Sequence, residues 1–132
     1  MNILLVNDDG VYAPGLAEME TALKPFGNVY TVAPSREQSG VAHTITFLTP
    51  LMMKQITVNG HFHPWAVDGS PADCVKIGIA EVMPERPDAV VSGINYGLNT
   101  GINILYSGTV NAAAEGVLYG IPSFAVSVER GR

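Results

Sequence analysis

The chain has 132 residues, of which 47% are apolar and 14% are charged, a balance that suits one domain with a hydrophobic core and excludes disorder. The net charge of −5 excludes the basic surface that nucleic-acid polymers require. No apolar run approaches the ~20 residues of a membrane helix. Cys74 is the single cysteine and is expected to be a buried thiol. With no signal segment at the start, this composition predicts a cytoplasmic protein.

The first third of the chain predicts a β-α-β unit. Its strands are expected at residues 2–6 and 29–33, and its helix, opened by a Pro-Gly pair, at residues 14–24. A polar loop over residues 34–44 follows the second strand. Such a long loop in a compact domain is often functional.

The middle of the chain interrupts this alternation. Residues 51–58 and 61–67 are strand-like, and Asn59-Gly60 between them is a strong hairpin signal. We therefore expect a β-hairpin that is either inserted into the sheet order or projects from it. Ser70-Pro71-Ala72-Asp73 then predicts a helix start, with Ser70 as the N-cap, and the helix is expected to reach about residue 82.

The last third returns to alternation, with strands expected at residues 89–92 and 123–128 and an Ala-rich helix at residues 109–119. Gly120 fits the left-handed position that follows the end of a helix. A long loop rich in Gly and Asn is expected at residues 93–107. The whole order predicts one α/β domain over residues 1–132, with a Rossmann-like, doubly wound, mostly parallel sheet and an inserted β-hairpin.

Two acidic residues, Asp8 and Asp9, directly follow the first predicted strand. Adjacent carboxylates repel each other and are costly to desolvate together, so a fold that holds both at the end of a buried strand usually balances them with a cation. The carboxyl ends of parallel strands meet at one edge, where Ser39 and Asn95 of the two long loops should join them. This oxygen ligand set suits Mg²⁺ or Mn²⁺. The alternative for Asp8 and Asp9 alone is a turn that closes the strand.

Ser107-Gly108-Thr109 precedes the third predicted helix. The unpaired N–H groups at such a helix start can bind a phosphate, although a plain Ser/Thr cap explains the same residues. His61 and His63 share one face of a predicted strand and are expected to have surface or packing roles, because no third zinc ligand lies near them. His43 is a candidate for proton transfer.

Five segments, in order along nearly the whole chain, resemble the survival protein E (SurE) nucleotidases, which are metal-dependent phosphatases of nucleoside monophosphates. The segments are Ile3-Leu4-Leu5-Val6-Asn7-Asp8-Asp9-Gly10, Ala33-Pro34-Ser35-Arg36-Glu37-Gln38-Ser39-Gly40, Val67-Asp68-Gly69-Ser70-Pro71-Ala72-Asp73-Cys74-Val75, Ser92-Gly93-Ile94-Asn95-Tyr96-Gly97-Leu98-Asn99-Thr100-Gly101 and Tyr106-Ser107-Gly108-Thr109-Val110. Any one of them could arise by chance, but five in sequence make the resemblance highly specific.

The resemblance assigns roles to residues of this chain. It implies one divalent metal ion, Mg²⁺ or Mn²⁺, held by Asp8, Asp9, Ser39 and Asn95. It implies a catalytic role for Asp8, Asp9 and Asn95, and a phosphate site formed by Ser39, Gly40, Asn95, Ser107, Gly108 and Thr109. The implied substrates are nucleoside 5′- and 3′-monophosphates and, for some members, polyphosphate.

The resemblance also implies a homodimer or homotetramer, with no nucleic-acid polymer and no membrane among the partners. Family members run on for about as long again beyond the last residue of this sequence. We therefore expect the chain to be truncated at its C-terminus relative to the family, with the remaining half completing the sheet and supplying most oligomer contacts.

Two alternatives remain from the residues themselves. A signalling receiver without turnover has a similar length, fold and acidic pair, but it also needs a phosphate-accepting Asp at the end of its third strand and a later Lys. Here Asp88 lies at the start of the corresponding strand, and no Lys follows Lys76. A haloacid-dehalogenase-type phosphatase needs Asp-x-Asp, whereas Asp8 and Asp9 are adjacent.

Overall fold

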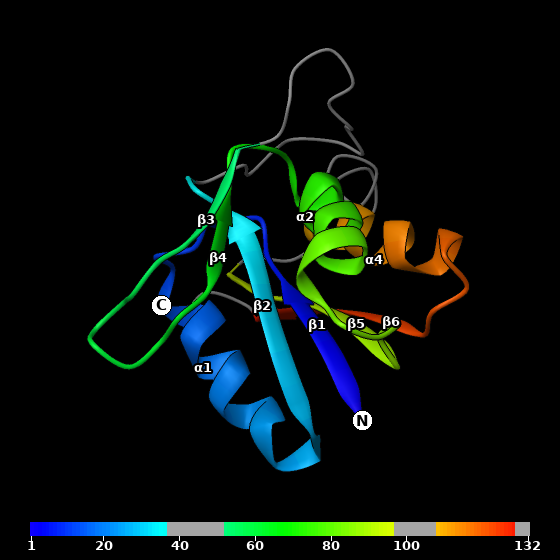
Figure 1. The fold of residues 1–132 in the computed structure, drawn as a ribbon, viewed down its shortest axis with the longest axis horizontal. Helices are drawn as coiled ribbons and strands as arrows, with labels where there is room; N and C mark the ends of the chain where they lie inside the picture. Colours follow the sequence, from blue (N-terminus) through cyan, green and yellow to red (C-terminus); the bar gives the residue numbers. More distant parts are fainter. Residues whose placement is uncertain (37–51, 97–107, 129–132) are drawn as a thin grey trace.

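The computed structural model describes residues 1–36, 52–96 and 108–128. Within these ranges six strands form one sheet in the order β3-β4-β2-β1-β5-β6 (Figure 1). The strands are β1 (Asn2–Val6), β2 (Asn28–Pro34), β3 (Met53–Gln55), β4 (Trp65–Val67), β5 (Ala89–Tyr96) and β6 (Ser123–Val128). The helices are α1 (Pro14–Leu23), α2 (Pro71–Ile77) and α4 (Gly108–Leu118), with a 3₁₀ turn at Lys24–Phe26 and a π turn at Gly78–Val82.

All neighbouring strands run parallel except β3, which is antiparallel to β4. The sequence prediction of a Rossmann-like, mostly parallel α/β sheet is therefore confirmed. Helix α1 lies on one face of the sheet, and α2 and α4 lie together on the other (Figure 1). No helix within the described ranges is both long enough and apolar enough to cross a membrane.

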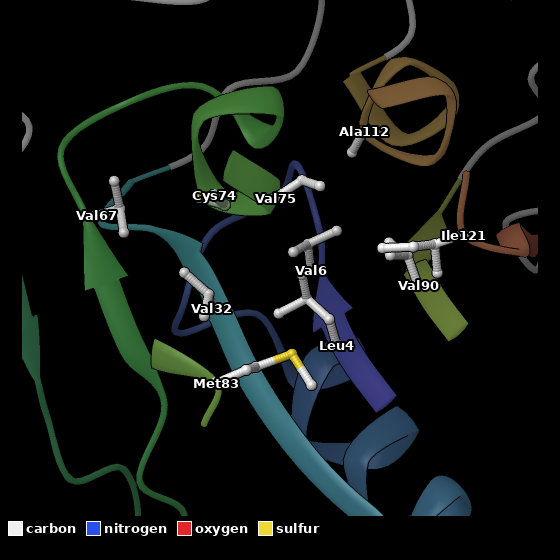
Figure 2. Packing of buried hydrophobic residues seen from close by; sticks show 10 residues of the cluster. All are labelled: Leu4, Val6, Val32, Val67, Cys74, Val75, Met83, Val90, Ala112 and Ile121. Atoms are coloured by element: carbon white, nitrogen blue, oxygen red, sulfur yellow. The ribbon is translucent and has the colours of Figure 1, made fainter. Parts of the chain in front are cut away.

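The central strand β1 is buried on both faces. Ile3 and Leu5 pack on the α1 side, whereas Leu4 and Val6 pack on the side of α2 and α4, as Figure 2 shows for the second cluster. Each of these four side chains is at most 2% exposed. A continuous apolar run is what a parallel strand covered by helices on both sides requires.

The hairpin is confirmed, and the structure decides how it joins the sheet. Asn59 and Gly60 have φ angles of 54° and 76°, as the favoured two-residue hairpin turn requires. Strand β4 pairs in parallel with β2, but only from Val32 to Pro34, so the hairpin joins the sheet and extends it beyond β2 at this end. Both of its strands are shorter than predicted. Nearer the turn the two arms form only an isolated antiparallel β-bridge, between Val58 and Phe62, and not a continuous ladder.

Strand β5 is longer than the sequence predicts. The expected strand ends at Ser92 and the expected loop begins at Gly93, yet β5 continues through Tyr96 with an irregular register opposite β6. Gly93 has a φ of 149°, and a Cβ there would lie 2.5 Å from the carbonyl oxygen of Val126. Residues 93–96 have a weak intrinsic preference for strands, and pairing with β6 supplies the backbone hydrogen-bond partners that make them one. A prediction from local sequence does not detect such a partner.

We predict that Leu4→Ala lowers the free energy of unfolding by about 2–5 kcal/mol, because Leu4 is fully buried and its truncation leaves a cavity beneath α2. Leu118→Ala is the matched control, since Leu118 is 75% exposed, and it should change stability by less than about 0.5 kcal/mol. Urea denaturation of both variants measures the difference. Equal losses would contradict the described packing of β1.

Candidate active site at the carboxyl edge of the sheet

A tight turn follows β1, and Asn7 builds it. The side chain of Asn7 is fully buried, donates from Nδ2 to the carbonyl oxygen of Gly10 at 2.9 Å, and accepts from the Gly10 N–H at Oδ1 at 3.2 Å. Gly10 has a φ of 103°, which favours glycine. The turn expected from Asp8-Asp9-Gly10 therefore exists, and the amide that closes it belongs to Asn7, which the sequence analysis did not single out.

The turn places the acidic pair at the carboxyl end of the central strand. Asp8 is 3% exposed, and Asp9 is half-buried. The Val11 N–H donates to the carbonyl oxygen of Pro34 at 2.8 Å, which ties the end of this turn to the end of β2. A buried carboxylate needs hydrogen bonds or positive charge around it, so the surroundings of Asp8 must stabilise its negative charge.

Asn95 reaches the same edge from β5. Because Ser92 is the register partner of Val6 at the end of β1, Asn95 lies three residues beyond the end of that strand, opposite Ser127 of β6. Asn95 was expected in a loop, and the structure instead places it in the strand, half-buried. The prediction that it comes to the carboxyl edge with Asp8 and Asp9 agrees with this topology.

Helix α4 begins at Gly108, as the Ser107-Gly108-Thr109 motif indicates, and packs against α2, β5 and β6. Because it returns from the carboxyl edge, its first turn lies at that edge. Gly120, with a φ of 75°, follows the helix end as expected. The predicted site residues Ser39, Gly40 and Ser107, with His43, lie outside the described ranges.

The donor set suits a hard divalent metal ion in its chemistry. Within residues 1–36, 52–96 and 108–128, no group of three or more His, Cys, Asp or Glu side chains gathers to hold a metal. A metal at this edge would therefore rest on the oxygens of Asp8 and Asp9 together with an amide oxygen from Asn95. Oxygen donors of this kind are those that Mg²⁺ and Mn²⁺ prefer, so the residues present fit such an ion.

A buried hydroxyl at this edge was missed by the sequence analysis. Ser92 is fully buried beside Val6, and its Oγ has no hydrogen-bond partner among the residues that the structure describes. A buried donor without a partner costs about 1–3 kcal/mol, so a polar residue at this position is not explained by packing alone. No pattern in the sequence distinguishes Ser92 from an ordinary strand residue.

Asp88 lies at the opposite edge. Its carboxylate Oδ2 accepts a hydrogen bond from the Asn2 N–H at 2.7 Å, at the amino end of β1. The receiver alternative needs an acidic residue at the end of the corresponding predicted strand, where β5 has Ser92 as the register partner of Val6. The topology thus removes the phosphate acceptor on which a receiver depends.

The histidines of the hairpin have surface positions, as expected. His61 and His63 are exposed. The His61 Nδ1 lies 2.7 Å from the carbonyl oxygen of Asn59, and the His63 Nδ1 lies 3.1 Å from the Thr57 hydroxyl. Each ring thus has a polar contact within the hairpin itself.

Helix α2 starts with a reciprocal capping box. Ser70 Oγ accepts from the Asp73 N–H at 3.2 Å, and Asp73 Oδ2 accepts from the Ser70 N–H at 2.9 Å. Cys74, the next residue, is fully buried, as predicted. Burial, with a smaller contribution from the Asp73 charge, raises the pKa of the Cys74 thiol well above its usual value. Burial of this kind disfavours the thiolate, which is the form that binds metals and acts as a nucleophile.

Three comparisons connect this arrangement with known proteins. The family profile described as Survival protein SurE matches residues 3–132. The 5′-nucleotidase SurE of Rhodopirellula baltica is 61% identical over 98% of this chain, and that of Syntrophobacter fumaroxidans is 55% identical over 98%. The crystal structure of SurE protein from Aquifex aeolicus is similar over 100% of this chain, with a TM-score of 0.89 and 48% identity. The chain spans about half of these relatives, 51%, 52% and 52% of their lengths respectively.

We predict that Cys74 resists alkylation by iodoacetamide at pH 8 in the folded protein and reacts fully in urea. The thiol should also make stability depend on pH. Above its unfolded pKa of about 8.5 the thiol ionises only in the unfolded chain, so the free energy of unfolding falls by up to about 1.4 kcal/mol per pH unit as pH rises. Urea denaturation at pH 7.5 and 9.5 measures this effect, and Cys74→Ala should lose it. An equal pH dependence in both proteins would contradict the burial.

Proposed function

Because the chain belongs to the Survival protein SurE family, we propose that its carboxyl edge is the catalytic centre of a divalent-metal-dependent nucleotidase. The relatives from Rhodopirellula baltica and Syntrophobacter fumaroxidans are called 5′-nucleotidases, and the proposal extends that activity to this chain. The observation that carries the proposal is the position of Asp8, with Asp9 beside it, at the carboxyl end of a fully buried central strand. Ligands of open α/β sheets bind at this edge.

In this proposal Asp8, Asp9 and Asn95 hold one Mg²⁺ or Mn²⁺, and Ser39 is the predicted fourth donor. When bound, such an ion supplies positive charge against the phosphate oxygens and makes water a better nucleophile. The turn closed by Asn7 fixes the backbone on which both carboxylates stand, so their positions are set before the ion arrives. The burial of Asp8 excludes water from one side of the site and strengthens its attraction for a cation.

The phosphoryl group of the substrate is bound at the start of α4. Its first backbone N–H groups, at Gly108 and Thr109, have no partner within the helix and carry the positive end of its dipole. With Asn95 and the predicted Ser107 and Gly40, they stabilise the negative charge of the phosphoryl group as it is transferred. The helix supplies partial positive charge from its backbone, so the site does not depend on basic side chains, which are few in this acidic chain.

Two routes for the attacking group fit these residues. In the first, an aspartate or His43 removes a proton from water, the water oxygen attacks the phosphorus, and the ester P–O bond breaks so that the nucleoside leaves with a proton on its oxygen. In the second, Asp8 attacks directly and forms an aspartyl-phosphate that water then hydrolyses. The proposal covers nucleoside 5′- and 3′-monophosphates and includes polyphosphate. The cytoplasmic location and the homodimeric or homotetrameric assembly stay predictions.

We predict that Asp8→Asn weakens Mn²⁺ binding at least about a hundredfold and removes nearly all turnover of adenosine 5′-monophosphate, because the amide keeps the shape of the side chain but loses its charge. Isothermal titration with Mn²⁺ and phosphate release measure the two effects separately. Asp88→Asn is the matched control, since Asp88 lies at the amino edge, and it should retain both properties. Unchanged turnover in the purified Asp8→Asn protein would overturn the assignment.

A second prediction concerns substrates. Nucleoside 5′- and 3′-monophosphates should release phosphate with Mg²⁺ or Mn²⁺, and a chelator should abolish release, because the acidic pair repels the phosphate without a cation. Acetyl phosphate separates this activity from a receiver. A stable phospho-adduct of the protein with no steady phosphate release would favour the receiver instead.

A further inference from the structure

A hollow of about 250 Å³ lies beyond the acidic pair along the carboxyl edge of the sheet, at the ends of β2 and β4 and the start of β3. Its lining combines two polar side chains with an apolar wall and one lysine. The residues are Ser35, Asp68, Met52, Met53, Ala66 and Lys54. The proposed phosphate site uses none of them.

The polar end of the hollow is an oriented carboxylate. The Ser35 hydroxyl donates to Asp68 Oδ1 at 2.5 Å. Backbone hydrogen bonds hold both residues in place. The Ser35 N–H donates to the carbonyl oxygen of Val67 at 2.8 Å, and the Asp68 N–H donates to the carbonyl oxygen of Met52 at 2.9 Å. Oδ2 of Asp68 makes no hydrogen bond with any residue that the structure describes, and the side chain is exposed. It is therefore able to accept a hydrogen bond from an O–H or N–H of a ligand.

The other side of the hollow is apolar. Ala66 is 7% exposed, Met53 is half-buried against the core, and Met52 is 66% exposed. Methionine adapts its shape and makes favourable sulfur contacts with aromatic rings. Lys54, the register partner of Ala66, contributes a basic side chain to the same lining. An aromatic ring that carries hydroxyl or amino donors matches this combination.

The hollow is within reach of the acidic pair. Strand β1 is the neighbour of β2, and β2 is the neighbour of β4, so the ends of β1 and β4 are about 10 Å apart across two strand spacings. The Val11–Pro34 hydrogen bond joins the turn after Asp9 directly to the residue before Ser35. A phosphate ester held at the acidic pair can extend its alcohol part along this edge into the hollow.

We propose that this hollow binds the nucleoside part of the substrate, with Asp68 accepting hydrogen bonds from its hydroxyl or amino donors and Met52 and Ala66 contacting its ring. The inference rests on the proposed nucleotidase function and adds the residues that would favour nucleotides over simple phosphate esters as substrates. Asp68 and Ser35 act on substrate binding, while the acidic pair and the start of α4 act on the phosphoryl group.

Kinetics of Asp68→Asn test this division. The substitution keeps an oxygen for Ser35 but removes the charge, so KM for adenosine 5′-monophosphate should rise about tenfold, as loss of one charge-assisted hydrogen bond implies. The kcat for that substrate, and kcat/KM for glycerol 2-phosphate, which has no ring, should remain unchanged. Asp88→Asn at the opposite edge should alter neither substrate. Equal losses on both substrates, or no change on either, would overturn the assignment of Asp68.

A binding experiment tests the hollow without turnover. In protein labelled at its methionine methyl groups, adenosine should shift the NMR signal of Met52, which is exposed beside the hollow, and leave that of Met83, which is buried in the core, in place. Asp68→Asn should weaken this binding by a similar factor. Shifts without any nucleotide turnover would support the hollow and count against the nucleotidase. Turnover without shifts would support the nucleotidase and overturn the hollow.

Discussion

The parallel pairing of β1 with both β2 and β5 is the constraint on which the rest of the structure depends. Strand β1 is the central buried strand, and its register with β2 and β5 sets where all three carboxyl ends lie. The burial of its side chains on both faces resists any slip of that register, because a shift by one residue would exchange the two faces. The acidic pair follows at once, so the same packing that stabilises the sheet also positions Asp8 and Asp9.

The two ends of the sheet have different roles. At the amino edge, backbone and side-chain hydrogen bonds join Asn2 with Asp88 and Met1 with Asn28, and a Cβ at Gly27 would lie only 2.0 Å from the Met1 carbonyl oxygen. At the carboxyl edge, among the residues that the structure describes, polar side chains such as Asp8 and Asp68 follow shortly after the paired part of their strands. The contrast follows from parallel topology, which uses one edge for closely packed connections and leaves the other for ligands.

The hairpin gives this edge its extent. By pairing in parallel with β2, strand β4 brings Asp68 beside Ser35, and the antiparallel pairing of β3 brings Met52, the residue before that strand, next to Asp68. Without these two strands the carboxyl edge would end at β2, next to the acidic pair. The hairpin thus widens the surface available to a ligand, which fits a substrate larger than phosphate itself.

The sequence predicted most of the fold because its signals are local and strong. The Asn59-Gly60 turn, the Ser70 cap and the Gly120 helix end each depend on the conformational preferences of a few adjacent residues. The motifs resembling the SurE family added the assignment of site residues that spacing alone left open. In the site, Asp8, Asp9 and the start of α4 at Gly108 were placed correctly at the carboxyl edge, because parallel topology fixes where each strand ends.

By itself, then, the sequence determined the alternating elements, the parallel class of the sheet and the acidic pair at its edge, since apolar periodicity and turn residues act over short distances along the chain. Only the tertiary structure decided the rest. It showed that β5 continues to Asn95, that the hairpin joins β2, and that Ser35 meets Asp68 from 33 residues away. Each of these depends on a partner strand distant in the sequence, and no local preference encodes the hydrogen bonds that such a partner supplies.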